Sequence, residues 1–210
     1  MKKLFAFTLA EVLLTMSIVG VVAAMTIPTL NYNRIKKEYS TKLKNFYSHM
    51  ENAVVDMQMD KGSFRDMEKP TDIPGAYDWY MEMIDPYMGH QYVDSTNRKV
   101  YFRDGSSIDH FFAAAESCLD LYYDVNGDKA PNRVGYDTYV FLMCFRDADR
   151  TYWFGNKDVF FGTYGGDISA TGTTRAQMLA KCGAAATAYW CSRLLQNDQW
   201  EFKSDYPYKF

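Results

Sequence analysis

The feature that most constrains this chain is an apolar run from Phe7 to Leu30 that is interrupted by one charge, Glu11. At about 1.5 Å per residue, a helix of this length measures about 36 Å, enough to span the roughly 30 Å hydrocarbon core of a bilayer. A carboxylate near the centre of a lone membrane helix costs about 2.5–3.5 kcal/mol. The chain therefore needs a partner group that offsets the placement of Glu11 in this run.

The helical pattern continues beyond the apolar run. Apolar residues recur every three or four positions on one face, while the other face is polar. These residues are Ile35, Tyr39, Leu43, Phe46, Met50, Val54 and Met57. Gly62 is a stop signal. The sequence predicts one helix over 7–61, with a transmembrane or filament-core part at 7–30 and an amphipathic part at 31–61, followed by a globular domain over 62–210.

The globular part alternates between strand-like and helix-like patterns. We expect a loop over 62–76, a helix over 76–88, and a hairpin of 100–102 with 108–113 around Asp104-Gly105. Further strands are expected at 119–124 and 138–145, and a second hairpin of 151–154 with 159–163 around Gly155-Asn156. Short helices are expected at 174–182 and 188–195. The pattern predicts an α+β fold with an antiparallel sheet.

The N-terminal stretch LFAFTLAEVLLTMSIVGVVAAMTIPTL resembles the signal of type IV prepilins and type II secretion pseudopilins. The resemblance implies that residues 1–6 are a leader, cut between Ala6 and Phe7 by a prepilin peptidase that methylates the new amino terminus. Glu11 then becomes the fifth residue of the processed chain, where this family keeps a glutamate. Gly20 and Pro28 lie where many pilins carry a glycine and a proline that weaken the helix. Ala6 departs from the usual glycine, and its small size is compatible with cutting.

The same resemblance implies a fold and a function. The fold is pilin-like, with the long helix packed on a C-terminal antiparallel sheet. The function is that of a structural subunit of a type IV pilus or a type II secretion-like pseudopilus, and both remain open. Such a subunit is a single-pass protein of the bacterial inner membrane before an assembly platform builds it into a homo- or hetero-oligomeric filament in the periplasm or at the cell surface.

Glu11 is the residue to which the resemblance gives a specific role. A buried charge needs an opposite charge, and the amino group of Phe7 on a neighbouring subunit provides one. In the alternative interpretation, the run is an ordinary signal or anchor of an exported enzyme or glycan-binding domain, with a cut after Ala24. A glutamate inside the run, and a helical pattern that continues directly downstream, favour the pilin interpretation.

Four cysteines are present in a domain that is expected to be exported, which favours disulfides. The short spacing between Cys182 and Cys191 favours a bond within that loop. Cys118 and Cys144 would then form the second bond, and buried free thiols are the alternative for each pair.

Oxygen-bearing side chains at alternate positions make residues 124–137 a candidate calcium loop. The candidate ligands are Asp124, Asn126, Asp128 and Asp137. The spacing is not that of an EF-hand, because Gly127 comes too early and Gly135 stands where a glutamate is needed. An Asn-Gly turn with solvated carboxylates is the alternative.

Charge and motifs exclude other classes of protein. The net charge of −3 gives no sign of a nucleic-acid surface, and basic residues gather only over 34–44, just past the apolar run. Counted by the positive-inside rule, that cluster favours an outside amino terminus, opposite to the orientation that the resemblance implies. His49, His90 and His110 share no metal-ligand spacing, and no nucleophile or nucleotide-binding motif occurs. We therefore expect a protein that is not an enzyme.

Overall fold

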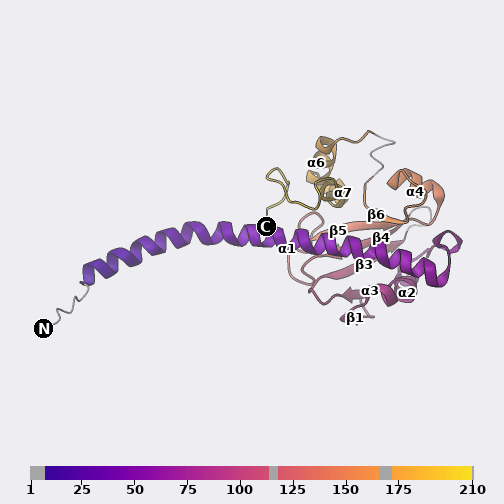
Figure 1. The fold of residues 1–210 in the computed structure, drawn as a ribbon, viewed down its shortest axis with the longest axis horizontal. Helices are drawn as coiled ribbons and strands as arrows, with labels where there is room; N and C mark the ends of the chain where they lie inside the picture. Colours follow the sequence, from indigo (N-terminus) through magenta and orange to yellow (C-terminus); the bar gives the residue numbers. More distant parts are fainter. Residues whose placement is uncertain (1–7, 114–117, 166–171, 210) are drawn as a thin grey trace.

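The chain folds into one long helix and a globular domain that packs on the second half of that helix (Figure 1). The structure, a computed structural model, describes residues 8–113, 118–165 and 172–209. Helix α1 runs without a break from Leu9 to Lys61. Gly62 ends it with a φ of 97°, a conformation that glycine adopts at little cost. The first half of α1 projects away from the domain, so the amino end of the helix lies far from the sheet.

The domain is built around a six-stranded antiparallel sheet in which each strand pairs with the next in sequence. The strands are β1 (Tyr92–Asp94), β2 (Lys99–Tyr101), β3 (Ser107–Ala113), β4 (Leu119–Asp124), β5 (Thr138–Met143) and β6 (Phe161–Thr163). Strands β4 and β5 pair along their full length, from Leu119 opposite Met143 to Asp124 opposite Thr138. The central strands therefore form the most regular part of the fold. This arrangement confirms the α+β class.

The second half of α1 is buried against this sheet. Its buried side chains recur at helical spacing and are Leu43, Phe46, Met50, Ala53, Val54 and Met57. The Phe46 ring stacks on Tyr123 of β4 at 3.9 Å between centroids and meets Phe141 of β5 edge-on at 5.1 Å. The amphipathic pattern thus predicted the buried face of α1 correctly from Leu43 to Met57. Ile35 and Tyr39, nearer the apolar half, are only partly buried.

Short helices pack around the sheet. They are η1 (Phe64–Asp66), α2 (Ile73–Met83), α3 (Asp85–Met88), α4 (Asp147–Phe154), α6 (Arg175–Gly183), η2 (Ala185–Trp190) and α7 (Cys191–Asn197). Tyr77 and Tyr80 of α2 pack on Phe111 of β3. Behind α7, Trp200 lies 5.1 Å from the Tyr47 ring of α1, so the C-terminal segment also holds the helix to the domain.

The predicted second hairpin is wrong in its first half. Residues 147–154 form helix α4, and only β6 follows as a strand. Asp147 and Asp149 lie in the first turn of α4, where carboxylates favour a helix, and Gly155 ends the helix in the left-handed conformation with a φ of 68°. The Gly155-Asn156 pair is therefore a helix end, although it resembles a hairpin turn.

Two other boundaries also differ from the expectation. Helix α2 begins before residue 76, because Asp72 caps it by accepting a hydrogen bond from the Gly75 N–H at 2.7 Å. The predicted helix then divides at Ile84, where Asp85 and Pro86 start α3. Pro86 has no N–H to continue the hydrogen bonds of α2, and it suits a first helical position.

The structure contains two disulfides, and both join the pairs that the sequence favours. Cys118, just before β4, is bonded to Cys144, just after β5. Cys182 near the end of α6 is bonded to Cys191 at the start of α7. The first bond ties together the two central strands, and the second closes the turn between two helices.

The packing of α1 on the sheet can be tested by truncating one ring. Phe46 is only 4% exposed, so Phe46→Ala should lower the free energy of unfolding by about 3–5 kcal/mol. Met59→Ala is the matched control, because Met59 is 81% exposed on the same helix and its truncation should change stability by less than about 0.5 kcal/mol. Urea unfolding of the full chain in detergent measures both. Equal losses for the two variants would contradict this account of the core.

Candidate functional site

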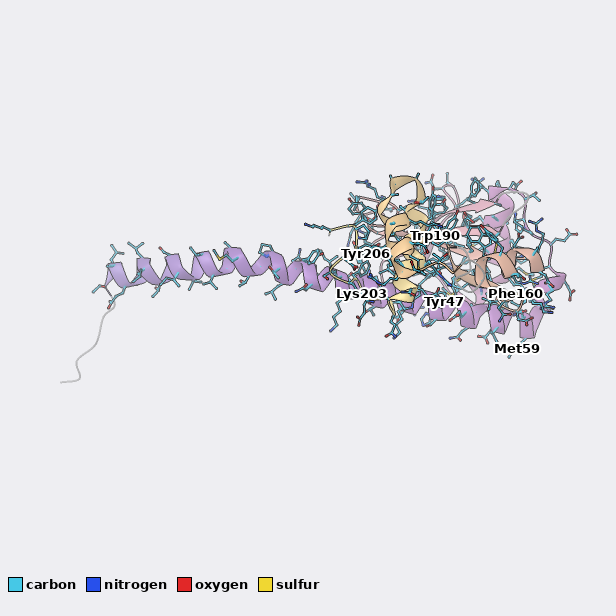
Figure 2. The ribbon with its side chains drawn as sticks, turned by 90° about the horizontal axis from the view of Figure 1, so that it is seen from above. Tyr47, Met59, Phe160, Trp190, Lys203 and Tyr206 are labelled. Carbon is cyan, nitrogen blue, oxygen red and sulfur yellow. A yellow bond between two sulfur atoms is a disulfide. The ribbon has the colours of Figure 1, made fainter. Side chains whose placement is uncertain are left out.

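The first half of α1 is an apolar surface that no described part of the chain covers (Figure 2). Its large exposed side chains, each between 41% and 76% exposed, are Leu9, Val12, Leu13, Leu14, Met16, Ile18, Val19, Val21, Val22, Met25, Ile27 and Leu30. They surround the helix on all sides, which is typical of a helix that is buried in lipid or among other helices. Among the described residues, α1 is also the one helix long and apolar enough to cross a membrane.

The polar side chains inside this segment are satisfied by the helix itself. The Thr15 hydroxyl donates to the carbonyl of Val12 at 2.9 Å, and the Ser17 hydroxyl donates to the carbonyl of Leu13 at 2.8 Å. Thr26 bonds back in the same way. A hydroxyl that bonds to its own helix needs no water. These three side chains therefore add little to the cost of placing the segment in an apolar environment.

Glu11 lies at the amino end of α1 and closes a capping box with Thr8. Its Oε2 accepts hydrogen bonds from the Thr8 N–H and the Thr8 hydroxyl, both at 2.8 Å. In return, the Glu11 N–H donates to Thr8 Oγ1 at 3.3 Å. This cap was not among the features predicted from the sequence, although Thr8 and Glu11 have the spacing of a capping box. Ala6 and Phe7 lie outside the described residues, so their placement relative to Glu11 stays a prediction.

Gly20 and Pro28 both lie within the continuous part of α1. Helix α1 curves gently here but is not broken (Figure 1). A Cβ added at Gly20 would meet nothing within 4 Å, so the glycine leaves open space on the helix surface. Gly20 and Ala24 are four residues apart and share one side of the helix, an arrangement that lets a second helix approach closely.

The basic cluster beyond the apolar run is partly used to hold the domain. The Lys42 amine donates to the carbonyl of Val125 at 2.9 Å and pairs with Glu38 at 3.2 Å. The Lys36 amine donates to the carbonyl of Phe202 at 3.4 Å. Arg34 pairs with Glu38 at 3.3 Å. Three of the five cations therefore contribute to the contact between α1 and its own domain or to the helix itself.

Three of the four candidate calcium ligands, Asp124, Asn126 and Asp137, come together between β4 and β5. Their side chains form hydrogen bonds with other groups of the protein. The Asp124 carboxylate accepts hydrogen bonds from the Asn126 N–H at 2.9 Å and the Thr138 hydroxyl at 3.1 Å. The Asp137 carboxylate accepts the N–H groups of Asn132 at 3.0 Å and Arg133 at 2.7 Å. Both carboxylates thus stabilise the loop through its own donors.

The fourth candidate ligand lies elsewhere. Asp128 is 63% exposed and pairs with the Lys99 amine at 2.8 Å. It also accepts from the Tyr101 hydroxyl at 2.9 Å. Within the described ranges, no group of three or more histidine, cysteine, aspartate or glutamate side chains is placed to hold a metal. Asn126 Oδ1 is buried and has no hydrogen-bond partner among the described residues. Calcium binding stays a prediction of the sequence.

A group of polar aromatic residues lies on the face of the sheet that points away from α1. His110 of β3 stacks on Tyr122 of β4 at 3.8 Å, and Tyr122 meets Tyr189 edge-on. Asp120 lies beside them, two residues before Tyr122. Burial raises the pKa of Asp120 to about 7, although the Lys69 charge opposes the shift. The alternation of β4 could have shown that Asp120 and Tyr122 share this face, but not that they are partly buried.

The raised pKa of Asp120 predicts a pH effect on stability. The Asp120 carboxyl ionises near pH 4 in the unfolded chain and near pH 7 in the folded chain. The free energy of unfolding of the wild type therefore falls as the pH rises from 4 to 7. Asp120→Asn cannot ionise, and its unfolding free energy relative to wild type should rise by on the order of 2 kcal/mol between pH 4 and pH 8. Urea unfolding followed by tryptophan fluorescence measures this difference.

Asp128→Asn is the control for this experiment, because its effect has the opposite sign. The hydrogen bond from Lys99 lowers the pKa of Asp128, so the ionised form is favoured in the folded state. The variant should lose a little stability relative to wild type as the pH rises past 4. Parallel pH profiles for Asp120→Asn and wild type would refute the assignment of a buried, neutral Asp120.

Comparison with known proteins gives one match. A family model matches residues 29–210, which are the second half of α1 and the whole globular domain, and leaves the apolar half of α1 outside. No curated protein and no solved structure matches the chain. The chain belongs to the family described as a family of unknown function, DUF6613.

Proposed function

We propose that this chain is a structural subunit of a pilin-type filament, either a type IV pilus or a secretion-type pseudopilus. The observation that carries the proposal is the apolar half of α1, which projects from the domain with apolar side chains on every side. Such a segment needs lipid before assembly and other helices afterwards. The N-terminal sequence from Leu4 to Leu30 adds the prepilin resemblance, and the helix-on-sheet architecture is compatible with a pilin-like fold.

The chemistry of assembly is packing rather than catalysis. A helix that leaves lipid for a helical core gains little from the hydrophobic effect, because both environments are apolar. The gain comes from close packing, which the open surface at Gly20 and Ala24 favours. Repeated heterologous contacts of this kind do not close into a ring and so extend into a filament. The rigid connection to the domain would place each domain on the outside of the helical core.

Processing supplies the charge that Glu11 needs. Cutting between Ala6 and Phe7 creates an amino group four residues before Glu11. That amine would lie near the same depth in a neighbouring subunit, where it can pair with the Glu11 carboxylate. The pair fixes the axial register of two helices, because an axial shift would leave each charge unpaired in an apolar environment. The partners of the chain are then a prepilin peptidase, an inner-membrane assembly platform and further pilin subunits.

The role of Glu11 can be separated from its cap. Glu11→Gln keeps an acceptor for Thr8 but removes the charge, so it should be processed normally while filament yield falls at least about tenfold. Glu11→Ala should fail in the same way. Thr8→Ala is the matched control, because it removes the cap side chain but keeps the carboxylate and should assemble close to the wild-type level. Sheared filaments are quantified by immunoblot and electron microscopy.

The opposite pattern would contradict the proposal. If Glu11→Gln assembles like wild type and Thr8→Ala does not, Glu11 serves only to cap its own helix. If both variants assemble normally, the carboxylate has no role in register.

A further inference from the structure

The outer face of the second half of α1 carries a charge gradient. Residues 31–45 contain five basic and one acidic side chain, a net charge of +4. Residues 46–90, which continue along α1 and into α2 and α3, contain three basic and nine acidic side chains, a net charge of −6. The chain is therefore basic where α1 leaves the apolar run and acidic from the end of α1 through α3.

Within α1 this gradient lies on a stripe opposite the buried face. Steps of three or four residues connect its exposed members, which are Lys37, Thr41, Lys44, Ser48, Asn52, Val55 and Met59. Asp56 and Asp60 flank the stripe near its acidic end. Figure 2 shows Met59 on the side of α1 that points away from the sheet. Val55 and Met59 are 47% and 81% exposed, so the acidic end also presents an apolar surface.

The free charges of this stripe cannot neutralise one another within one chain. In the part of the chain that the structure describes, no ion pair or hydrogen bond holds the amines of Lys37 and Lys44 or the carboxylate of Asp56. Lys44 and Asp56 are separated by about 18 Å along one rigid helix, far beyond the reach of two side chains. Any direct contact between them must involve a second molecule.

We infer that a second copy of this chain docks on this stripe, with the basic end of one copy against the acidic end of the other. Parallel helices staggered by about 15 residues, or about 22 Å, would place Lys44 beside Asp60. The stem of Lys44 could then cover Met59 while its amine reaches the carboxylate. Each copy keeps one free basic and one free acidic end, so the contact repeats without closing. This inference rests on the proposed filament function and specifies one of its contacts.

Zero-length cross-linking tests the contact directly. Carbodiimide joins an amine to a carboxylate only when the two touch, so a link from Lys37 or Lys44 to Asp56 or Asp60 must be intermolecular. We expect such links by mass spectrometry when full-length protein in its native membranes is treated. No such links in wild type, while other intermolecular links form, would overturn the inference.

A charge swap tests its physical basis. Lys37→Glu with Lys44→Glu should lower the yield of α1–α1 linked dimers about tenfold or more. Adding Asp56→Lys and Asp60→Lys to the same chain should restore at least about half of that yield, because the attraction is re-formed with its signs exchanged. Lys129→Glu with Lys157→Glu is the matched control: it changes the net charge equally at exposed sites outside α1 and should leave the yield unchanged.

The outcomes separate this contact from the filament proposal and from lipid binding. Linked dimers without filaments would retain the contact and remove the filament function. Filaments without these links would remove the contact and retain the function. If the reversed variant is defective and the swap does not restore it, the lysines bind anionic lipid headgroups rather than a second copy, and the inference fails.

Discussion

The packing of Phe46 between Tyr123 and Phe141 is the interaction on which the rest of this structure depends. It holds α1 against the centre of the sheet, and because α1 is continuous from Leu9 to Lys61, it also fixes the direction of the apolar half. One helix therefore serves two environments. Its second half contributes to an ordinary protein core, and its first half extends beyond that core as an apolar arm, which we propose lies in a bilayer or a helical assembly.

The contacts of the basic cluster bear on the orientation of the chain. Arg34, Lys36 and Lys42 make hydrogen bonds or ion pairs on α1 or with the domain, so they have a structural role apart from topology. Of the five basic residues over 34–44, Lys37 and Lys44 make no ion pair or hydrogen bond within the described part of the chain. A count that treats all five as signals for a cytoplasmic loop overstates the conflict with an orientation in which the domain is exported.

The sequence predicted those parts of the fold that follow from local periodicity. The buried face of α1 and the bounds of β4 depend on residue spacing alone, and both are correct. Helix α4 was missed because Gly155 can end a helix as readily as it can turn a hairpin. The candidate calcium loop shows a second limit. Spacing could bring Asp124 and Asp137 near one another. It could not show that these carboxylates accept hydrogen bonds from loop N–H groups and the Thr138 hydroxyl, or that Asp128 pairs with Lys99.

The measurement that tests the central claim most directly is the amino-terminal sequence and intact mass of the protein isolated from membranes. A chain that starts at N-methylated Phe7, with residues 1–6 removed and Glu11 retained in the anchor, is the predicted result. A chain that starts at Met25, after an ordinary signal-peptide cut, would lack most of the apolar arm and would contradict the account. An uncut chain that still begins at Met1 would contradict it as well.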